Sequence, residues 1–185
     1  MEFTKYDKLG AYHWLEFEQP GSSYREHALI VADWVGPGVT LDVGAGDGLI
    51  TWLINAELEK DCVGIDDNPK AVELAAEQGS SVELLSIYDL NVKAKFDNIY
   101  CGDVIEHLEF PAKALANMHK ALKPNGKLYL VTPPSKPNGK VQDPFHYFEW
   151  TEEQLQENVE AQGFKLESIE TKEHLKRMYA KFIKQ

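Results

Sequence analysis

Glycines and a carboxylate follow two short apolar segments in the first half of the chain. Gly44, Gly46 and Gly48 come after the apolar run that ends at Val43, and Asp66 closes the next apolar run. Closely spaced glycines between a strand and a helix bring backbone N–H groups near a ligand, because no Cβ stands in the way. A carboxylate about 20 residues further on is suited to accept hydrogen bonds from a ribose diol. Together these residues predict a site for an adenosine-type ligand.

The spacing of the glycines narrows the class of ligand. The dinucleotide fingerprint G-x-G-x-x-G needs glycine at position 49, where this chain has leucine, so the spacing argues against NAD or FAD. No Gly-Lys-Ser/Thr follows, which excludes a phosphate-binding P-loop. Asp66 directly follows its strand and is favoured over Asp67 as the ribose ligand. A tight turn without a binding role is the alternative interpretation of the glycines alone.

A second group of ionisable side chains lies further along the chain. Asp103, Glu106 and His107 fall close together, and His146 follows in a proline-rich stretch. Histidine can take a proton near neutral pH, so His107 and His146 are both candidate general bases, with Asp103 beside them. Histidines that are simply hydrogen-bonded to the loop backbone are an equally good interpretation. The four side chains could instead bind a divalent metal ion through two carboxylates and two imidazoles.

Alternating helices and strands place these groups at one edge of a sheet. Apolar runs predict strands over 39–43, 62–66, 82–85, 96–101, 127–131, 164–171 and 178–183. Amphipathic or capped segments predict helices over 22–35, 48–59, 68–79, 111–122 and 151–163. Such βαβ units form a parallel sheet whose ligands bind beyond the carboxyl ends of the strands. Loops 44–48, 66–69, 86–90, 101–107 and 132–147 should therefore open on the same rim.

Four motifs in order give the chain a family resemblance: LDVGAGDG (41–48), VGIDDNPKAVELA (63–75), FDNIYCGDVIEHL (96–108) and ALKPNGKLYLVTPP (121–134). With them the chain resembles the class I S-adenosylmethionine-dependent methyltransferases over roughly residues 38–170. The segment HYFEWTEEQLQENVEAQGF (146–164) is similar to the stretch that many members carry before their sixth strand. The resemblance implies an α/β, Rossmann-like three-layer sandwich whose seven-stranded sheet is mostly parallel, with the last strand antiparallel.

The resemblance also implies S-adenosyl-L-methionine as cofactor and S-adenosyl-L-homocysteine as product. The cofactor-binding residues that it indicates are Asp42, Gly44, Ala45, Gly46, Gly48, Asp66, Asp67, Ser86, Asp89, Cys101, Gly102 and Asp103. The last three would lie near the sulfonium. Many members have an Asp after the third strand that binds the adenine amino group. This chain has Ser86 there, and either Ser86 or Asp89 could take the role.

A narrower resemblance supplies a competing hypothesis. Small-RNA 3′-terminal 2′-O-methyltransferases have a Glu-x-x-Glu-His motif and a later His-x-Phe-Glu-Trp motif. This chain is similar at Asp103, Glu106 and His107 and again over 146–150, although Asp103 stands where that family has Glu. A net charge of −11 with only two arginines, Arg25 and Arg177, disfavours nucleic acid as a partner.

Composition predicts one globular domain. A chain of 185 residues with 43% hydrophobic and 26% charged residues can build one core. We expect one domain over 1–185, with an N-terminal cap segment (1–21) and a lid-like loop (133–150). The absence of an 18-residue apolar run and of an apolar N-terminal signal predicts no membrane span and a cytoplasmic protein. Cys62 and Cys101 both lie in predicted strands, which indicates buried thiols and no disulfide framework.

The sequence thus predicts a methyltransferase that acts on oxygen or nitrogen of a small molecule, with His107, His146 and Asp103 as candidate catalytic residues and no metal. Aromatic residues in the cap (Tyr12, Trp14, Phe17) and in the lid (Phe145, Tyr147, Phe148, Trp150) form either an acceptor pocket or ordinary core. Two alternatives stay open. One is the metal-assisted RNA 2′-O-methyltransferase, with Asp103, Glu106, His107 and His146 as ligands. The other is a non-catalytic cofactor-binding protein that acts as an assembly partner.

Overall fold

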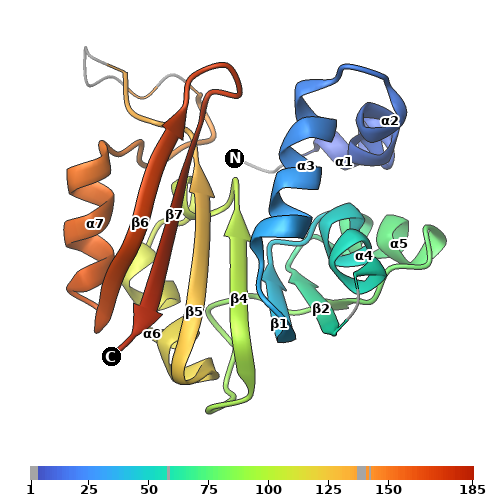
Figure 1. Cartoon of the computed structure of the whole chain (residues 1–185). Coiled ribbons are helices and arrows are strands. Elements are labelled where there is room, and N and C mark those ends of the chain that lie inside the picture. The colour runs from blue at the N-terminus through green and yellow to red at the C-terminus, as the bar shows by residue number, and fades with distance from the viewer. Residues whose placement is uncertain (1–3, 58, 137–140, 142) are drawn as a thin grey trace. The chain divides into compact units, whose positions relative to one another are not determined.

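A computed structural model of the chain describes residues 4–57, 59–136, 141 and 143–185. The described residues form two compact units, one ending at Ile87 and one beginning at Tyr88. Figure 1 labels most of the helices and strands. The single domain predicted over 1–185 stays a prediction, and the units are described in turn.

The first unit carries three parallel strands in the order β3-β2-β1. These strands are β1 (Gly38–Val43), β2 (Lys60–Asp66) and β3 (Val82–Leu84). Helices α3 (Ser23–Trp34), α4 (Leu49–Ala56) and α5 (Pro69–Glu77) precede or connect them. The last four residues of β1, Thr40 to Val43, are all buried, as expected of a strand in a parallel sheet covered on both faces.

Local capping explains where two of these helices begin. The Ser22 side chain accepts from the backbone N–H groups of Tyr24 and Arg25 at the start of α3. The Asn68 side chain accepts from Lys70 and Ala71, and Pro69 occupies the first turn of α5. Both helix starts were predicted from the sequence and are confirmed.

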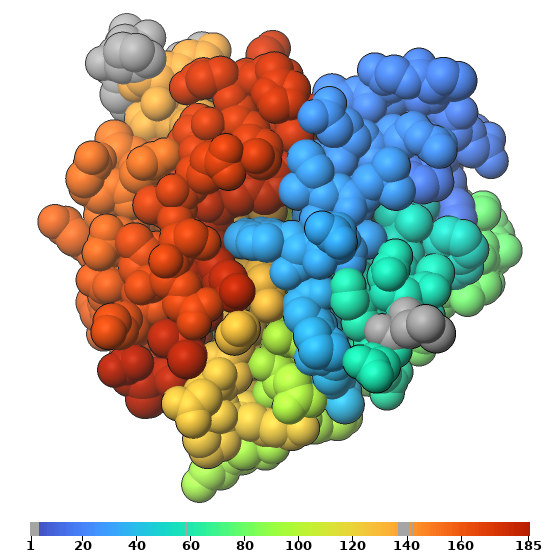
Figure 2. Space-filling view, viewed as in Figure 1, coloured from blue at the N-terminus to red at the C-terminus, as the bar shows by residue number. Residues whose placement is uncertain are grey.

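The N-terminal cap segment contains two short helices that hydrophobic periodicity did not predict. They are α1 (Lys5–Leu9) and α2 (Tyr12–Glu18). Tyr6 and Tyr12 are buried and pack against Ala71 and Leu74 of α5. Figure 2 shows the blue atoms of α1, α2 and α3 as one continuous outer surface of this unit.

The second unit carries four strands in the order β4-β5-β7-β6. They are β4 (Phe96–Gly102), β5 (Leu122–Thr132), β6 (Phe164–Lys172) and β7 (Arg177–Lys184). β4 and β5 are parallel, whereas β7 is antiparallel to both β5 and β6. Helices α6 (Pro111–Ala121) and α7 (Glu152–Glu160) pack against β5 and β6, and the short 3₁₀ helix η1 (Ile105–His107) follows β4. The predicted capping box at Thr151 and Gln154 is confirmed at the start of α7.

Strand β5 begins earlier than the sequence predicted. The Lys123–Gly126 segment was expected to separate a helix from a strand beginning at Lys127, but β5 begins at Leu122. The register with β4 passes from Phe96↔Leu122 to Asn98↔Lys127, so the extra residues form a bulge. Asn125 has a φ of 61°, a left-handed conformation that asparagine tolerates. Residues 123–126 therefore interrupt the regular strand pairing, but they lie within β5 rather than before it.

Part of the predicted lid lies outside the described residues, namely 137–140 and 142 of the 133–150 loop. Within the described part, Pro134 and Trp150 form an isolated parallel bridge, and the Ser135 amide donates to the Trp150 carbonyl at 2.8 Å. The two ends of the loop are thus fixed to one another.

The strand order is β3-β2-β1-β4-β5-β7-β6. It confirms the predicted Rossmann-like α/β class with a seven-stranded, mostly parallel sheet in which the last strand is antiparallel. Cys62 and Cys101 are buried free thiols, as predicted. Among the described residues no helix has the length and apolar character needed to cross a membrane.

Candidate functional site

The glycine loop of the first unit has a backbone that requires glycine. Gly44, Gly46 and Gly48 have φ values of 70°, 57° and 79°, in the left-handed region that side-chain-bearing residues rarely adopt. A Cβ on Gly46 would overlap the Tyr6 ring, and one on Gly48 would lie 2.5 Å from the Ser80 Cβ. Gly48 is also the N-cap of α4. The loop therefore connects β1 to α4 with no room for a side chain at Gly46 or Gly48.

Asp66 contacts this loop directly. Its Oδ2 accepts from the Gly46 amide at 2.8 Å, and its Oδ1 accepts from the Asn68 amide at 2.8 Å. Burial raises the pKa of Asp66, and these two N–H donors lower it, with a net rise. Asp67 is exposed. Of the two candidate ribose ligands, the structure thus places Asp66 at the glycine loop.

Asp42 is buried rather than open to a ligand. Its side chain is 2% exposed, and its Oδ2 accepts from the Thr51 hydroxyl at 2.7 Å. Burial raises the pKa of Asp42 to about 7. Asp42 contacts α4 through Thr51, so it would influence a bound cofactor by positioning α4 and the glycine loop. Its role in cofactor binding stays a prediction.

The N-terminal helices bind to the same loop through Asp47. The His13 amide donates to Asp47 Oδ2 at 3.0 Å, and His13 Nδ1 pairs with Asp47 Oδ1 at 3.0 Å. Trp14 Nε1 donates to the Asp47 carbonyl at 2.8 Å. Sequence reasoning missed Tyr6, His13 and Asp47. Their only sequence signal was the position of an aromatic-rich segment ahead of the first strand.

The other predicted cofactor residues fall into both units. Ser86 is half-buried after β3 in the first unit, and Asp89 is exposed in the second. Cys101 is fully buried within β4, and a Cβ on Gly102 would overlap the Tyr100 ring. The structure gives no ligand contact for these residues, so their roles stay predictions.

Asp103, at the end of β4, forms an ion pair that sequence reasoning missed. Arg177 Nε and Nη2 both contact Asp103 Oδ2, at 2.9 and 2.7 Å. Asp103 has a φ of 52°, and its amide donates to the Val131 carbonyl at 2.8 Å. Its carboxylate therefore has the Arg177 guanidinium as its partner.

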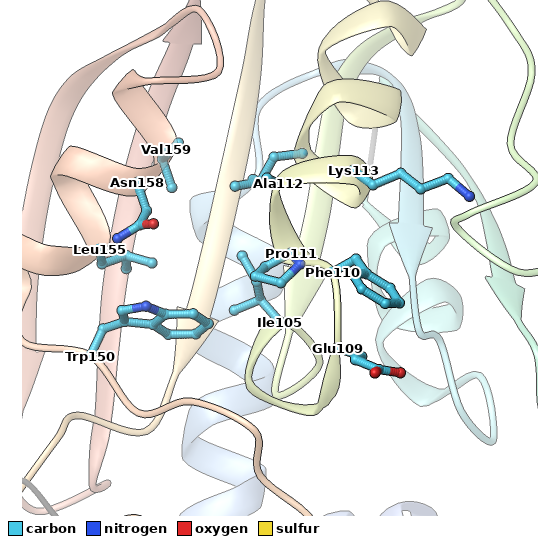
Figure 3. Close-up of a pocket in the computed structure, with 11 residues that line it drawn as sticks. Ile105, Glu109, Phe110, Pro111, Ala112, Lys113, Trp150, Leu155, Asn158 and Val159 are labelled. Carbon is cyan, nitrogen blue, oxygen red and sulfur yellow. The ribbon is translucent and has the colours of Figure 1, made fainter.

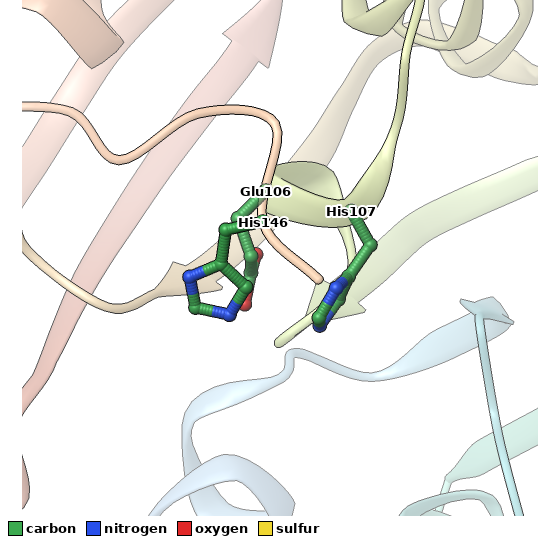
Figure 4. Close-up of side chains that lie close together, drawn as sticks. All are labelled: Glu106, His107 and His146. Atoms are coloured by element: carbon green, nitrogen blue, oxygen red, sulfur yellow. The ribbon is translucent and has the colours of Figure 1, made fainter. Parts of the chain in front are cut away.

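Three of the four candidate metal ligands meet in the second unit. Ligand atoms of Glu106, His107 and His146 all lie within 4.8 Å of one another. Figure 4 shows the three side chains converging from η1 and from the loop ahead of α7. The two imidazole rings are edge to face, with centroids 4.7 Å apart. Asp103, the fourth candidate, is not among the three and pairs with Arg177.

Hydrogen bonds orient each member of the cluster. Glu106 is 1% exposed, and its Oε2 accepts from the Thr132 hydroxyl at 2.9 Å. His107 Nδ1 lies 3.0 Å from the Phe145 carbonyl oxygen. His146 Nδ1 lies 2.9 Å from Glu149 Oε1. Burial and, next, the Asp103 charge raise the pKa of Glu106 to about 8, whereas burial lowers the pKa of His107.

An apolar cavity of about 450 Å³ also lies in this unit, beside α6 and α7. Figure 3 shows Trp150 and Leu155 on one side of it and Ile105 and Pro111 on the other. Of the lid aromatics, for which an acceptor pocket and ordinary core packing were both left open, Trp150 lines this cavity. Tyr147 and Phe148 are exposed, and Phe148 stacks on Trp150 with ring centroids 5.4 Å apart.

Comparison with known proteins gives the same class. Residues 41–130 match the family model described as a methyltransferase domain. The mitochondrial ubiquinone biosynthesis O-methyltransferase of Schizosaccharomyces pombe is 31% identical over 101 residues, which are 50% of this chain and 36% of that protein. Phosphoethanolamine N-methyltransferase 2 of Caenorhabditis elegans is 32% identical over 161 residues, which are 78% of this chain and 36% of that protein. The chain thus spans little more than a third of the length of these two curated relatives.

A solved structure supports the fold. The 1,6-didemethyltoxoflavin-N1-methyltransferase of Burkholderia thailandensis, solved with bound 1,6-didemethyltoxoflavin and S-adenosylhomocysteine, superposes with a TM-score of 0.73 at 22% identity. The alignment covers 97% of this chain and 86% of that one. Fold, glycine loop and family match together define a methyltransferase domain. This agrees with the resemblance to the class I S-adenosylmethionine-dependent methyltransferases that the four motifs carry.

Proposed function

We propose that the chain is an S-adenosylmethionine-dependent methyltransferase that methylates oxygen or nitrogen of a small molecule and releases S-adenosylhomocysteine. The observation that carries this proposal is the glycine loop with the Asp66 carboxylate against the Gly46 amide. Each carboxylate oxygen has two lone pairs, so Asp66 can keep its backbone donors and still accept from ribose hydroxyls. The three glycines carry no Cβ, so the backbone of the loop can lie close to the rest of the cofactor.

A small acceptor is supported by charge and by the relatives. The net charge of −11 repels a polyanion, and only two arginines are present to grip phosphates. The two curated relatives are named for ubiquinone biosynthesis and for phosphoethanolamine, both small molecules. We therefore favour a small-molecule acceptor over RNA.

Methyl transfer makes modest demands on the protein. The sulfonium is a good leaving group, so the protein has to orient the acceptor, exclude water and deal with the acceptor's proton. In the second unit the ionisable groups for that last task are His107 and His146, with Glu106 beside them. Asp103, also predicted as a catalytic residue, pairs with Arg177, and its catalytic role stays a prediction.

Calorimetry with S-adenosylmethionine and S-adenosylhomocysteine tests the cofactor assignment. We expect Asp66→Ala to weaken binding by about 5- to 150-fold, since it leaves ribose hydroxyls and loop amides without an acceptor (about 1–3 kcal/mol). Asp67→Ala removes a neighbouring exposed carboxylate, and we expect less than about a twofold change. Circular dichroism checks that both variants fold. Equal losses in the two variants would contradict the role given to Asp66.

An acceptor screen separates the remaining alternatives. Phenols, catechols, amines and a short RNA with a free 3′ end are incubated with labelled S-adenosylmethionine, and methylated products are measured. Turnover of small molecules is the expected result. Turnover of the RNA alone would favour the RNA methyltransferase, and tight cofactor binding without turnover of any acceptor would favour a non-catalytic binding protein.

A further inference from the structure

Helix α2 takes its N-terminal cap from the glycine loop. The first amides of a helix have no partner within it, and the side chain before α2, that of Ala11, makes no capping hydrogen bond. Asp47 supplies the acceptor from 34 residues away, since its Oδ2 accepts from the His13 amide at 3.0 Å. A helix of seven residues is marginal on its own. The start of α2 therefore depends on the glycine loop.

Two further hydrogen bonds join α2 to the same residue. His13 Nδ1 lies 3.0 Å from Asp47 Oδ1, and because a carboxylate can only accept, this ring nitrogen carries a proton. Trp14 Nε1 donates to the Asp47 carbonyl at 2.8 Å. The Asp47 side chain is 1% exposed, and both of its oxygens contact His13. Loss of these donors would leave a buried carboxylate with fewer partners, so Asp47 favours the arrangement in which α2 lies on the loop.

Helix α1 places an aromatic side chain against the loop. Tyr6 is 6% exposed, and its hydroxyl would overlap a Cβ on Gly46. The His13 ring is 3.7 Å from the same Cβ position. The Gly46 amide is the group that donates to Asp66, the carboxylate assigned to the cofactor ribose. Helices α1 and α2 thus cover the glycine that the proposed ribose ligand contacts, and all of these residues belong to the first unit.

We propose that Asp47 is a positioning residue for the cofactor. It holds α1 and α2 on the glycine loop, and these two helices move away to admit S-adenosylmethionine and close again over it. The contacts between Asp47 and His13 break on opening and form on closing. Closure of such segments shields a bound ligand from water and slows its release. The proposal rests on the proposed function, because the ligand concerned is the cofactor of the same loop.

This arrangement has a kinetic signature. A segment that must open before the ligand can pass slows both entry and release. Weaker contacts between Asp47 and His13 should therefore raise the association and dissociation rate constants together and leave the Kd nearly unchanged. A residue that contacts the ligand itself would change mainly the dissociation rate constant. The two rate constants therefore distinguish control of access from direct binding.

Surface plasmon resonance of the full chain with S-adenosylhomocysteine measures both rate constants. We expect His13→Ala to raise each by about 10-fold or more, the effect of one hydrogen bond to a charged group, with less than about a threefold change in Kd. Asp47→Ala should do the same to a larger extent, and circular dichroism checks its fold. Glu18→Ala, which removes an exposed carboxylate of α2, is the matched control and should keep the parent's rate constants.

A conservative variant separates the bond to Asp47 from the packing of the imidazole. His13→Asn keeps a side-chain N–H donor at the same number of bonds from the backbone as Nδ1, but it loses the ring that stacks on Tyr24. We expect it to restore both rate constants to within about threefold of the parent. Failure of this rescue would overturn the proposal. Parental rate constants in His13→Ala, or a faster dissociation with unchanged association, would overturn it as well.

Hydrogen exchange tests the two helices without the cofactor. We expect the backbone amides of residues 5–18 to exchange about 10-fold faster in His13→Ala than in the parent, with no change in β1. Equal exchange in the two proteins would overturn the proposal. A parent that binds no S-adenosylhomocysteine would refute the proposed function and the cofactor role of Asp47 with it. A parent that binds it with rate constants insensitive to His13 would refute only the role of α1 and α2.

Discussion

Replacement of Asp42 by asparagine should make the chain more stable at alkaline pH. Asp42 is 2% exposed in β1, and its Oδ2 accepts from the Thr51 hydroxyl at 2.7 Å. Burial raises its pKa from 3.8 to about 7. Asparagine has nearly the same shape, carries no charge, and keeps an amide oxygen that can accept from Thr51.

The direction of the pH dependence follows from linkage. The folded state has the higher pKa, so it holds the Asp42 proton more tightly than the unfolded state does. Stability from this proton is complete below the unfolded pKa of 3.8 and is lost as the pH rises toward about 7. A shift of about 3 units at about 1.4 kcal/mol each gives an upper bound of roughly 4 kcal/mol. About 2–3 kcal/mol of it falls between pH 5 and pH 8.

Urea unfolding at pH 5 and pH 8 measures this effect. We expect the difference in free energy of unfolding, Asp42→Asn minus parent, to grow by about 2–3 kcal/mol from pH 5 to pH 8. Asp61→Asn removes an exposed carboxylate of β2, and its difference should change by less than about 0.5 kcal/mol. If Asp42→Asn and the parent have parallel stability curves between these pH values, the buried carboxyl is not the cause and the reasoning fails.

Two further substitutions test packing and charge away from the proposed chemistry. In Gly64→Ala the new Cβ would lie 2.5 Å from the Ala45 Cβ, so we expect a loss of about 1–3 kcal/mol in urea unfolding, and an unchanged midpoint would contradict the packing at this position. Arg177→Ala leaves the Asp103 carboxylate without its cation, and we expect a loss of about 1–3 kcal/mol by the same assay. Lys172→Ala, which breaks an ion pair with an exposed carboxylate, is its control and should cost less than about 1 kcal/mol, so equal losses would refute the weight given to Asp103.

Local signals in the sequence predicted most of the fold. The glycines after β1, the Asn68 cap and the Thr151 capping box each act on backbone groups only a few residues away. Their structural consequences can therefore be predicted from the local sequence. The same holds for the position of Asp66 at the end of β2. Glycine spacing and an acidic strand end sufficed to indicate the cofactor loop.

Long-range pairings could not be predicted in this way. Arg177 and Asp103 are separated by 74 residues, and only the sheet, in which β5 lies between β4 and β7, brings them together. Helices α1 and α2 are short, and α2 presents aromatic rings whose partners lie in α5 and the glycine loop. Helices of this length depend on tertiary packing rather than on intrinsic helix propensity, so no local sequence pattern predicts them.

The acidic residues at the strand ends show how such pairings assign roles. Asp42, Asp66 and Asp103 all lie at or near the ends of strands. Each carboxylate has a partner within its own unit: the Thr51 hydroxyl for Asp42, the Gly46 amide for Asp66 and the Arg177 guanidinium for Asp103. Glu106 lies one 3₁₀ turn beyond Asp103, is as deeply buried as Asp42, and faces two imidazoles rather than a cation. Sequence spacing alone made Asp103 and Glu106 equivalent candidates for metal binding. The pairing of Arg177 with Asp103 separates them, because it gives one carboxylate a cationic partner and leaves the other hydrogen-bonded to Thr132 beside two histidines.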